Sequence, residues 1–200
     1  GAVAAGIPVS AKMRLGIADT QKTLECAAAL ESGGVCSLVV HARTKLEGYR
    51  PPAHWEWIAR VREAVSVPVV ANGEIWTVDD YLRCRAVTGC ADVMLGRGAV
   101  ADPCLARRIC AVCDGVELEA SIDAAWSELI PLLDEFWLRV QQRVTARHAP
   151  GRLKLWLNSL RRTYPQAEAL YQRVRGLRDI AEVGRVLADE KALAMPAGLC

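Results

Sequence analysis

Four short apolar runs alternate with amphipathic stretches in the first half of the chain. The runs have the length of strands, and they cover residues 8–15, 36–41, 68–71 and 92–95. The stretches between them carry apolar residues at helical spacing, and the third opens with a capping box at 77–80 and ends at Gly89. The first of these helices is expected to take its cap from Asp19 or Thr20. This pattern predicts repeated strand-helix units with parallel strands.

The spacing of these units is typical of a barrel. Four landmark residues recur every 24 to 31 positions: Lys12, His41, Asn72 and Gly96. In such units the carboxyl ends of the strands lie on one face, where sites form. A closed (β/α)8 barrel needs eight strands and typically about 250 residues, whereas this pattern predicts four strands. We therefore predict an α/β fold in which residues 1–112 form the C-terminal half of a TIM (β/α)8 barrel that begins mid-sequence.

Helical patterns alone occupy the rest of the chain. Apolar residues keep a helical period over 122–144, through Pro131, where a kink or a break is expected. Two further apolar stripes cover 153–160 and 170–177, with basic residues on the adjoining faces. We predict that residues 113–200 form an all-α helical bundle that is apolar inside and basic on one side.

Composition and cysteine spacing limit the class of protein. A hydrophobic content of 52% with 24% charged residues is that of an ordinary globular protein. No apolar run approaches the roughly 18 residues of a membrane span, and the first residues do not resemble a signal peptide, so a cytoplasmic protein is expected. The eight cysteines are scattered through helix and strand patterns, which favours reduced thiols. Cys110 and Cys113 lack a second such pair, so two thiols on a helix are favoured over a metal or redox site, and no metal is predicted.

The net charge of +2 conceals an uneven distribution. Between Arg139 and Arg178, ten basic residues stand against one acidic residue, Glu168, so the rest of the chain carries a charge of −7. A basic C-terminal region on an acidic body predicts a polyanionic partner, with nucleic acid first among the candidates.

Two strand ends carry glycines of the kind that bind anions. Asn72-Gly73-Glu74 and Gly96-Arg97-Gly98 each follow an apolar run and precede a helical pattern, which offers backbone N–H groups to a phosphate. Each motif alone is equally typical of a tight turn, and only their pairing on successive strands favours a phosphate clamp. Lys12 is either a cofactor contact or a solvated strand lysine. His41 is expected at the barrel mouth together with Arg43, although alone it is more often a satisfied core histidine.

Taken together, these residues carry a family resemblance. The segments are 9–16 (VSAKMRLG), 40–44 (VHART) with Tyr49, 68–75 (PVVANGEI) and 93–99 (VMLGRGA). In this order and spacing they closely resemble the tRNA-dihydrouridine synthases. The tail segments 152–157 (RLKLWL), 160–164 (LRRTY) and 171–175 (YQRVR), with Trp76, are similar to the bacterial C-type subfamily.

The resemblance implies an oxidoreductase that uses FMN, with NADPH as reductant, to saturate the C5–C6 bond of a uridine in the tRNA D-loop. For the C-type this is the uridine at tRNA position sixteen. The motif match implies a cofactor-binding set of seven residues: Lys12, His41, Asn72, Gly73, Glu74, Gly96 and Arg97. It also implies three residues that contact tRNA: Arg152, Lys154 and Arg175. No membrane or protein partner is implied.

One departure from the family pattern is serious. None of the eight cysteines stands in the motif of the family's acid cysteine, so no catalytic residue is predicted, and the chain is expected to be a C-terminal portion that is inactive alone. Two other functions stay open. One is an FMN-dependent barrel enzyme that acts on a small molecule, and the other is a non-catalytic RNA-binding module.

Overall fold

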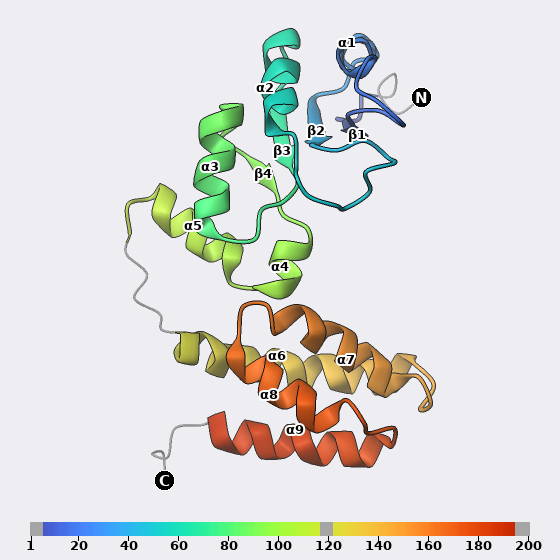
Figure 1. Ribbon diagram of the computed structural model, residues 1–200, viewed down its shortest axis with the longest axis vertical. Coiled ribbons are helices and arrows are strands. Elements are labelled where there is room, and N and C mark those ends of the chain that lie inside the picture. Colours follow the sequence, from blue (N-terminus) through green and yellow to red (C-terminus); the bar gives the residue numbers. More distant parts are fainter. Residues whose placement is uncertain (1–5, 117–121, 195–200) are drawn as a thin grey trace. The chain divides into compact units, whose positions relative to one another are not determined.

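The computed structural model describes residues 6–116 and 122–194, and these residues contain four strands and nine helices (Figure 1). Contacts between residues divide the chain into two compact units, an N-terminal unit, Gly1–Gly98, and a C-terminal unit, Ala99–Cys200. The domain boundary predicted between residues 112 and 113 stays a prediction.

A four-stranded parallel sheet lies at the centre of the N-terminal unit. In spatial order, which is also chain order, its strands are β1 (Ser10–Arg14), β2 (Ser37–His41), β3 (Val69–Asn72) and β4 (Val93–Met94). The predicted strands and their parallel arrangement are confirmed. The register aligns one residue from each strand near its carboxyl end: Arg14, His41, Asn72 and Met94. Aligned residues of neighbouring strands share a face, so this row brings four side chains to one place.

Each of the first three strands leads into a helix. These helices are α1 (Thr23–Ser32), α2 (Trp55–Ala64) and α3 (Val78–Thr88), and α2 packs against both α1 and α3 (Figure 1). α1 contacts β1 and α2 contacts β3. The apolar strand and helix residues that meet are fully buried: Leu38, Val40, Ala71, Ile58 and Val61. The helical spacing of the sequence is therefore explained by burial of one helix face.

The ends of α3 were predicted correctly from local sequence signals, whereas the start of α1 was not. Thr77 and Asp80 form the predicted capping box, because each side chain accepts a hydrogen bond from the backbone N–H of the other. Gly89 ends α3 with φ at 66°. For α1 the predicted cap is wrong, since Lys22 occupies the N-cap without a side-chain bond. The carboxylate of Asp19 accepts instead from the N–H of Gln21 in the preceding turn, at 3.0 Å.

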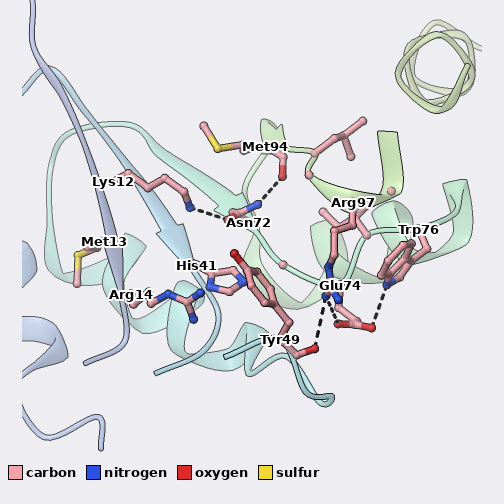
Figure 2. Close-up of a pocket in the computed structure, with 15 residues that line it drawn as sticks. Lys12, Met13, Arg14, His41, Tyr49, Asn72, Glu74, Trp76, Met94 and Arg97 are labelled. Carbon is pink, nitrogen blue, oxygen red and sulfur yellow. Dashed lines mark hydrogen bonds and ion pairs between the residues drawn. The ribbon is translucent and has the colours of Figure 1, made fainter. Parts of the chain in front are cut away.

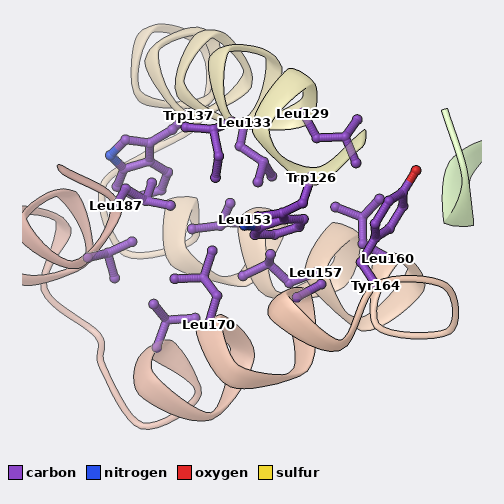
Figure 3. Close-up of a cluster of buried hydrophobic side chains, with 14 of the residues drawn as sticks. Trp126, Leu129, Leu133, Trp137, Leu153, Leu157, Leu160, Tyr164, Leu170 and Leu187 are labelled. Atoms are coloured by element: carbon purple, nitrogen blue, oxygen red, sulfur yellow. The ribbon is translucent and has the colours of Figure 1, made fainter. Parts of the chain in front are cut away.

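The C-terminal unit is helical throughout its described residues. The short α4 (Arg97–Ala101) crosses the boundary of the two units and is followed by α5 (Leu105–Cys113). A bundle follows, made of α6 (Ile122–Arg143), α7 (Ala149–Leu160), α8 (Pro165–Val174) and α9 (Ile180–Ala194). Its buried core draws on all four helices, as Figure 3 shows for Trp126, Leu153, Leu170 and Leu187. The side chain of Ile122, which begins the predicted stripe, lies outside the described residues.

Pro131 lies inside α6, which runs through it as one helix. The break offered as one outcome in the sequence analysis is therefore wrong. A proline within a helix costs about 3 kcal/mol because it removes a backbone hydrogen bond. Burial on the same helix outweighs this cost, since Leu129 and Leu133 are each 1% exposed and Trp137 is 4% exposed.

Two predictions from composition concern cysteines and membranes. The seven cysteines among the described residues form no disulfide bond, while Cys200 lies outside those residues. Cys110 and Cys113 are exposed and lie on α5, as predicted. Within the ranges 6–116 and 122–194, we find no helix that is both long and apolar enough to cross a membrane.

Candidate functional site

A pocket of about 560 Å³ opens at the carboxyl ends of the strands in the N-terminal unit (Figure 2). All seven residues predicted to bind the cofactor line it: Lys12, His41, Asn72, Gly73, Glu74, Gly96 and Arg97. They come from β1, β2, β3 and the segments that follow β3 and β4. The parallel register explains this convergence, because it places the functional ends of all four strands at one edge.

Lys12 and Asn72 form a hydrogen-bonded chain across the pocket. The Nζ of Lys12 donates to the Oδ1 of Asn72 at 2.7 Å, and the Nδ2 of Asn72 donates to the backbone carbonyl of Met94 at 2.7 Å (Figure 2). Asn72 thus ties the ends of β1 and β4 to β3. Partial burial, followed by the nearby charge of Arg14, lowers the pKa of Lys12. The ammonium is therefore a cation that an anion or an electron-rich ring would stabilise.

His41 is the buried polar group of the pocket. Its side chain is 6% exposed, and it has no hydrogen-bond partner among the residues that the structure describes. Burial is the main cause that lowers the pKa of His41 to about 4, and the positive charges of Arg14, Lys12, Arg43 and Arg97 add to it. The imidazole is therefore neutral at pH 7, and its ring nitrogens are available to a ligand.

The turn after β3 requires a glycine. Gly73 has φ at +123°, a left-handed backbone conformation that side chains disfavour. A Cβ atom at this position would lie 3.2 Å from the Cδ2 atom of His41. The Nε1 of Trp55 donates to the carbonyl of Gly73 at 2.9 Å and fixes the turn from the other side. The glycine therefore lets the chain pass directly beside the histidine ring.

Arg43 does not face the pocket as predicted. Its side chain is fully buried and forms an ion pair with Glu74, while its Nε donates to the carbonyl of Pro52 at 3.1 Å. The reason is electrostatic, since a guanidinium stays charged at all ordinary pH values and its burial requires an anion. His41, two residues earlier, does line the pocket.

Glu74 is shared among three neighbours. Besides Arg43, it accepts a hydrogen bond from the Nε1 of Trp76 at 2.9 Å and lies 3.7 Å from the NH2 of Arg97. Burial is the largest influence on the pKa of Glu74 and raises it, but the hydrogen bonds and positive charges of these neighbours outweigh burial and lower the pKa overall. The carboxylate is therefore ionised at neutral pH and already compensated. It acts on the pocket through the arginine and tryptophan side chains that it holds.

Arg97 lies between two aromatic rings. Its Cζ atom is 4.8 Å from the ring centroid of Tyr49 and 4.9 Å from that of Trp76 (Figure 2). Its NH2 also lies 3.5 Å from the carbonyl oxygen of Tyr49. Stacking of a guanidinium on aromatic faces restrains it without neutralising it. The pocket therefore presents a fixed cation at the start of α4, shortly after β4.

Eight lining residues were not among the predicted site residues: Met13, Arg14, Tyr49, Ile75, Trp76, Met94, Leu95 and Gly98. Arg14 donates to the carbonyls of Thr44 and Gly48 at 2.9 and 3.0 Å, and so holds the loop that carries Tyr49. A sequence signal for Arg14 existed, because a residue two positions after Lys12 on a strand shares its face. No periodic signal marks Tyr49, which lies in an irregular loop.

A second feature is a group of cations on the C-terminal unit. Within the predicted basic stretch from Arg139 to Arg178, five exposed arginines form no ion pair with any residue in the described ranges: Arg143, Arg147, Arg152, Arg175 and Arg178. We call this group the basic end. Its members lie at the end of α6, near the start of α7 and after α8, which meet at one end of the bundle (Figure 1). The other predicted basic positions differ, since Arg139, Arg161 and Arg173 are paired with acidic side chains.

The three predicted tRNA contacts lie close together, but they are not equivalent. The Nζ of Lys154 on α7 donates to the carbonyl of Leu177, just after α8, at 2.6 Å. This bond shows that the start of α7 lies beside the end of α8, which brings Arg152 and Arg175 to the same region. Lys154 satisfies a backbone carbonyl of the bundle, whereas the two arginines are exposed and unpaired within the described part of the chain.

Comparisons with known proteins place the chain in a family. Residues 2–182 match the profile of the family described as dihydrouridine synthase (Dus). Similar curated proteins bear the name tRNA-dihydrouridine(16) synthase. The protein from Aquipseudomonas alcaligenes is 55% identical over 93% of this chain and 58% of its own length. The protein from Ralstonia nicotianae is 54% identical over 96% of this chain and 57% of its own length.

A third protein with that name, from Neisseria meningitidis serogroup A, is 44% identical over 92% of this chain and 54% of its own length. The chain thus spans somewhat more than half the length of these curated relatives. The family match covers both the pocket and most of the helical bundle. The chain belongs to the dihydrouridine synthase family.

Proposed function

We propose that this chain functions in a flavin-dependent tRNA-dihydrouridine synthase that reduces the C5–C6 double bond of a D-loop uridine, at tRNA position sixteen, with FMN as cofactor and NADPH as reductant. One observation carries the proposal. The seven residues that match the family's cofactor motifs converge on a single pocket at the carboxyl ends of parallel strands. The four strand-helix units are proposed to be half of a (β/α)8 barrel, and the helical bundle a tRNA-binding domain.

The residues present fit a flavin phosphate. His41 offers a largely buried, neutral ring without a hydrogen-bond partner in the described residues, and its ring nitrogens suit a polar ligand atom. A Cβ atom added to Gly96 would meet no atom within 4 Å, so a ligand has room to approach the backbone there. Arg97, the next residue and the first of α4, supplies a restrained cation. We place the phosphate beside Gly96 and Arg97, and the flavin ring toward Lys12.

The roles of the side chains follow from this placement. Bound FMN would supply a hydride to the uracil ring. Lys12, held by Asn72, would stabilise negative charge on the ring system, and His41 would hold one polar edge of it without adding charge. Glu74 would hold Arg97 in place. It would not contact the phosphate itself, because a carboxylate and a phosphate repel each other. In this scheme the chain's contribution is binding and orientation.

The basic end supports tRNA as the substrate. An exposed cluster of unpaired arginines attracts a polyanion and releases counterions when phosphates bind. An enzyme for a small metabolite does not need such a surface, which weighs against the first alternative function. Arg152 and Arg175 are the proposed phosphate contacts, and Lys154 is proposed to support the helix ends that present them.

The proposal is tested by the dihydrouridine content of tRNA. Because the chain alone is expected to be inactive, unmodified tRNA would be incubated with the purified full-length gene product that carries the whole proposed barrel, together with FMN and NADPH, and the mass of the D-loop fragment would be measured by mass spectrometry. An increase by two hydrogen atoms at position sixteen is expected, and it should be reduced by Lys12→Met. Bound flavin without tRNA reduction would favour a small-molecule enzyme. Salt-sensitive tRNA binding without flavin would favour an RNA-binding module.

A further inference from the structure

Arg43 differs from the other cations beside the pocket, because no part of its side chain reaches the pocket. Its side chain is 0% exposed, and its NH1 group is buried without a hydrogen-bond partner in the described residues. Burying a guanidinium is costly unless its charge is compensated. The compensating anion is Glu74, which lies at the pocket and is also within ion-pair distance of Arg97. The buried cation and the cation of the pocket therefore share one carboxylate.

The charge balance of this group depends on Arg43. With two arginines and one glutamate, the group carries a net charge of +1. Without Arg43 the group would be neutral, because Glu74 would be left with Arg97 as its single cationic partner. The 3.7 Å separation of Glu74 and Arg97 would then be free to shorten. An incoming anion would have to compete with the carboxylate for Arg97.

The backbone of Glu74 gives a second reason to assign a role to Arg43. Glu74 has φ at 58°, in the left-handed region that residues other than glycine rarely adopt. Such a conformation persists when the surroundings hold it in place. The ion pair with Arg43 and the 2.9 Å hydrogen bond from Trp76 hold the carboxylate from two sides. The position of Glu74, and through it that of Arg97, is therefore set from inside the protein.

We propose that Arg43 is a positioning residue for anion binding in this pocket: it takes up the charge of Glu74 and thereby leaves the charge of Arg97 available to the phosphate of the cofactor. Arg43 acts through Glu74 and touches no ligand. This proposal rests on the proposed function, because it takes the phosphate of FMN as the anion that Arg97 meets.

The test compares two ligands that differ in one phosphate, FMN and riboflavin. Their dissociation constants would be measured by flavin fluorescence in the purified protein and in two variants. Arg43→Met should lower the preference for FMN over riboflavin about tenfold or more, the value of one charge-assisted hydrogen bond, while riboflavin affinity stays nearly constant. The double variant Arg43→Met with Glu74→Gln removes both charges of the ion pair, leaves Arg97 unopposed, and should restore the preference.

The comparison separates positioning from a merely structural role. Loss of structure would weaken FMN and riboflavin equally, and it would not change the preference. An unchanged preference in Arg43→Met, or a preference that the double variant does not restore, would overturn the assignment of Arg43. If Arg43→Met does not fold, the double variant decides alone: a preference like that of the unmodified protein supports the inference, and a lost preference overturns it. If the unmodified protein itself shows no preference for FMN, the placement of the phosphate fails, and the role of Arg43 fails with it.

Discussion

Gly73 gives the sharpest structural prediction, because its effect follows from the backbone angle and the space available at this position. The backbone there has φ at +123°, and a Cβ atom would lie 3.2 Å from the Cδ2 of His41. A left-handed conformation costs a side chain about 1–2 kcal/mol, and overpacking adds about 1 kcal/mol or more. Gly73→Ala should therefore lower the free energy of unfolding of the N-terminal unit by about 2–4 kcal/mol.

Gly48 provides a matched control. It also has a positive φ, at +62°, but a Cβ atom there would meet nothing within 4 Å. Gly48→Ala should cost only the backbone contribution, about 1–2 kcal/mol. Hydrogen exchange of peptides from β2 and β3 would report the stability of the N-terminal unit for both variants. Equal losses of stability in the two variants would show that the contact with His41 has no energetic importance, and would refute the reasoning.

Three further predictions concern other parts of the chain. The folded pKa of His41, about 4, is below its ordinary value of 6.5, so its contribution to stability should be complete above pH 6.5 and lost as the pH falls toward 4. The loss should be at most about 3 kcal/mol. In urea unfolding across this pH range, the free energy of unfolding of His41→Asn should change less with pH than that of the unmodified protein, and an equal pH dependence in the two proteins would contradict this. The Oη of Tyr164, which is fully buried, donates to Asp102 at 2.7 Å. Tyr164→Phe should therefore cost about 1.5–3 kcal/mol in urea unfolding, and a change near zero would show that the bond is dispensable. Replacing Arg152 and Arg175 with alanine should reduce the slope of log tRNA affinity against log salt by about 2, and parallel lines would exclude the basic end from RNA binding.

Local signals in the sequence were sufficient for much of the fold. The capping box at Thr77 and the glycine at position 89 mark α3 correctly, because both act within a few residues of the backbone that they stabilise. The strands are visible as short apolar runs for a similar reason, since they are buried against helices that follow in the chain. The cofactor motifs were recognisable because each ends a strand, and the parallel order of strands brings strand ends together.

The remaining features depend on contacts between distant residues. The burial of Arg43 is decided by Glu74, thirty-one positions later, and no local pattern distinguishes it from an arginine that faces a ligand. The contact of Lys154 with tRNA stays a prediction, but no local pattern indicates its hydrogen bond to the carbonyl of Leu177, which the turn after α8 brings near. Helix α9 differs, because Ile180, Val183 and Leu187 have helical spacing, so the sequence does contain a local signal for it beyond the stripe that ends at residue 177. Tertiary contacts decide the surroundings of Arg43 and Lys154.

The central claim, that the pocket holds a flavin phosphate beside Arg97, is tested most directly by FMN affinity in two arginine variants. Arg60 is a matched control, because its guanidinium also stacks on an aromatic ring, that of Trp57 at 4.6 Å, but lies on α2 and does not line the pocket. Arg97→Ala should weaken FMN binding roughly 10- to 100-fold, as expected for the loss of a hydrogen bond to a charged group. Arg60→Ala should leave FMN affinity unchanged. Equal FMN affinity in the two variants would contradict the account.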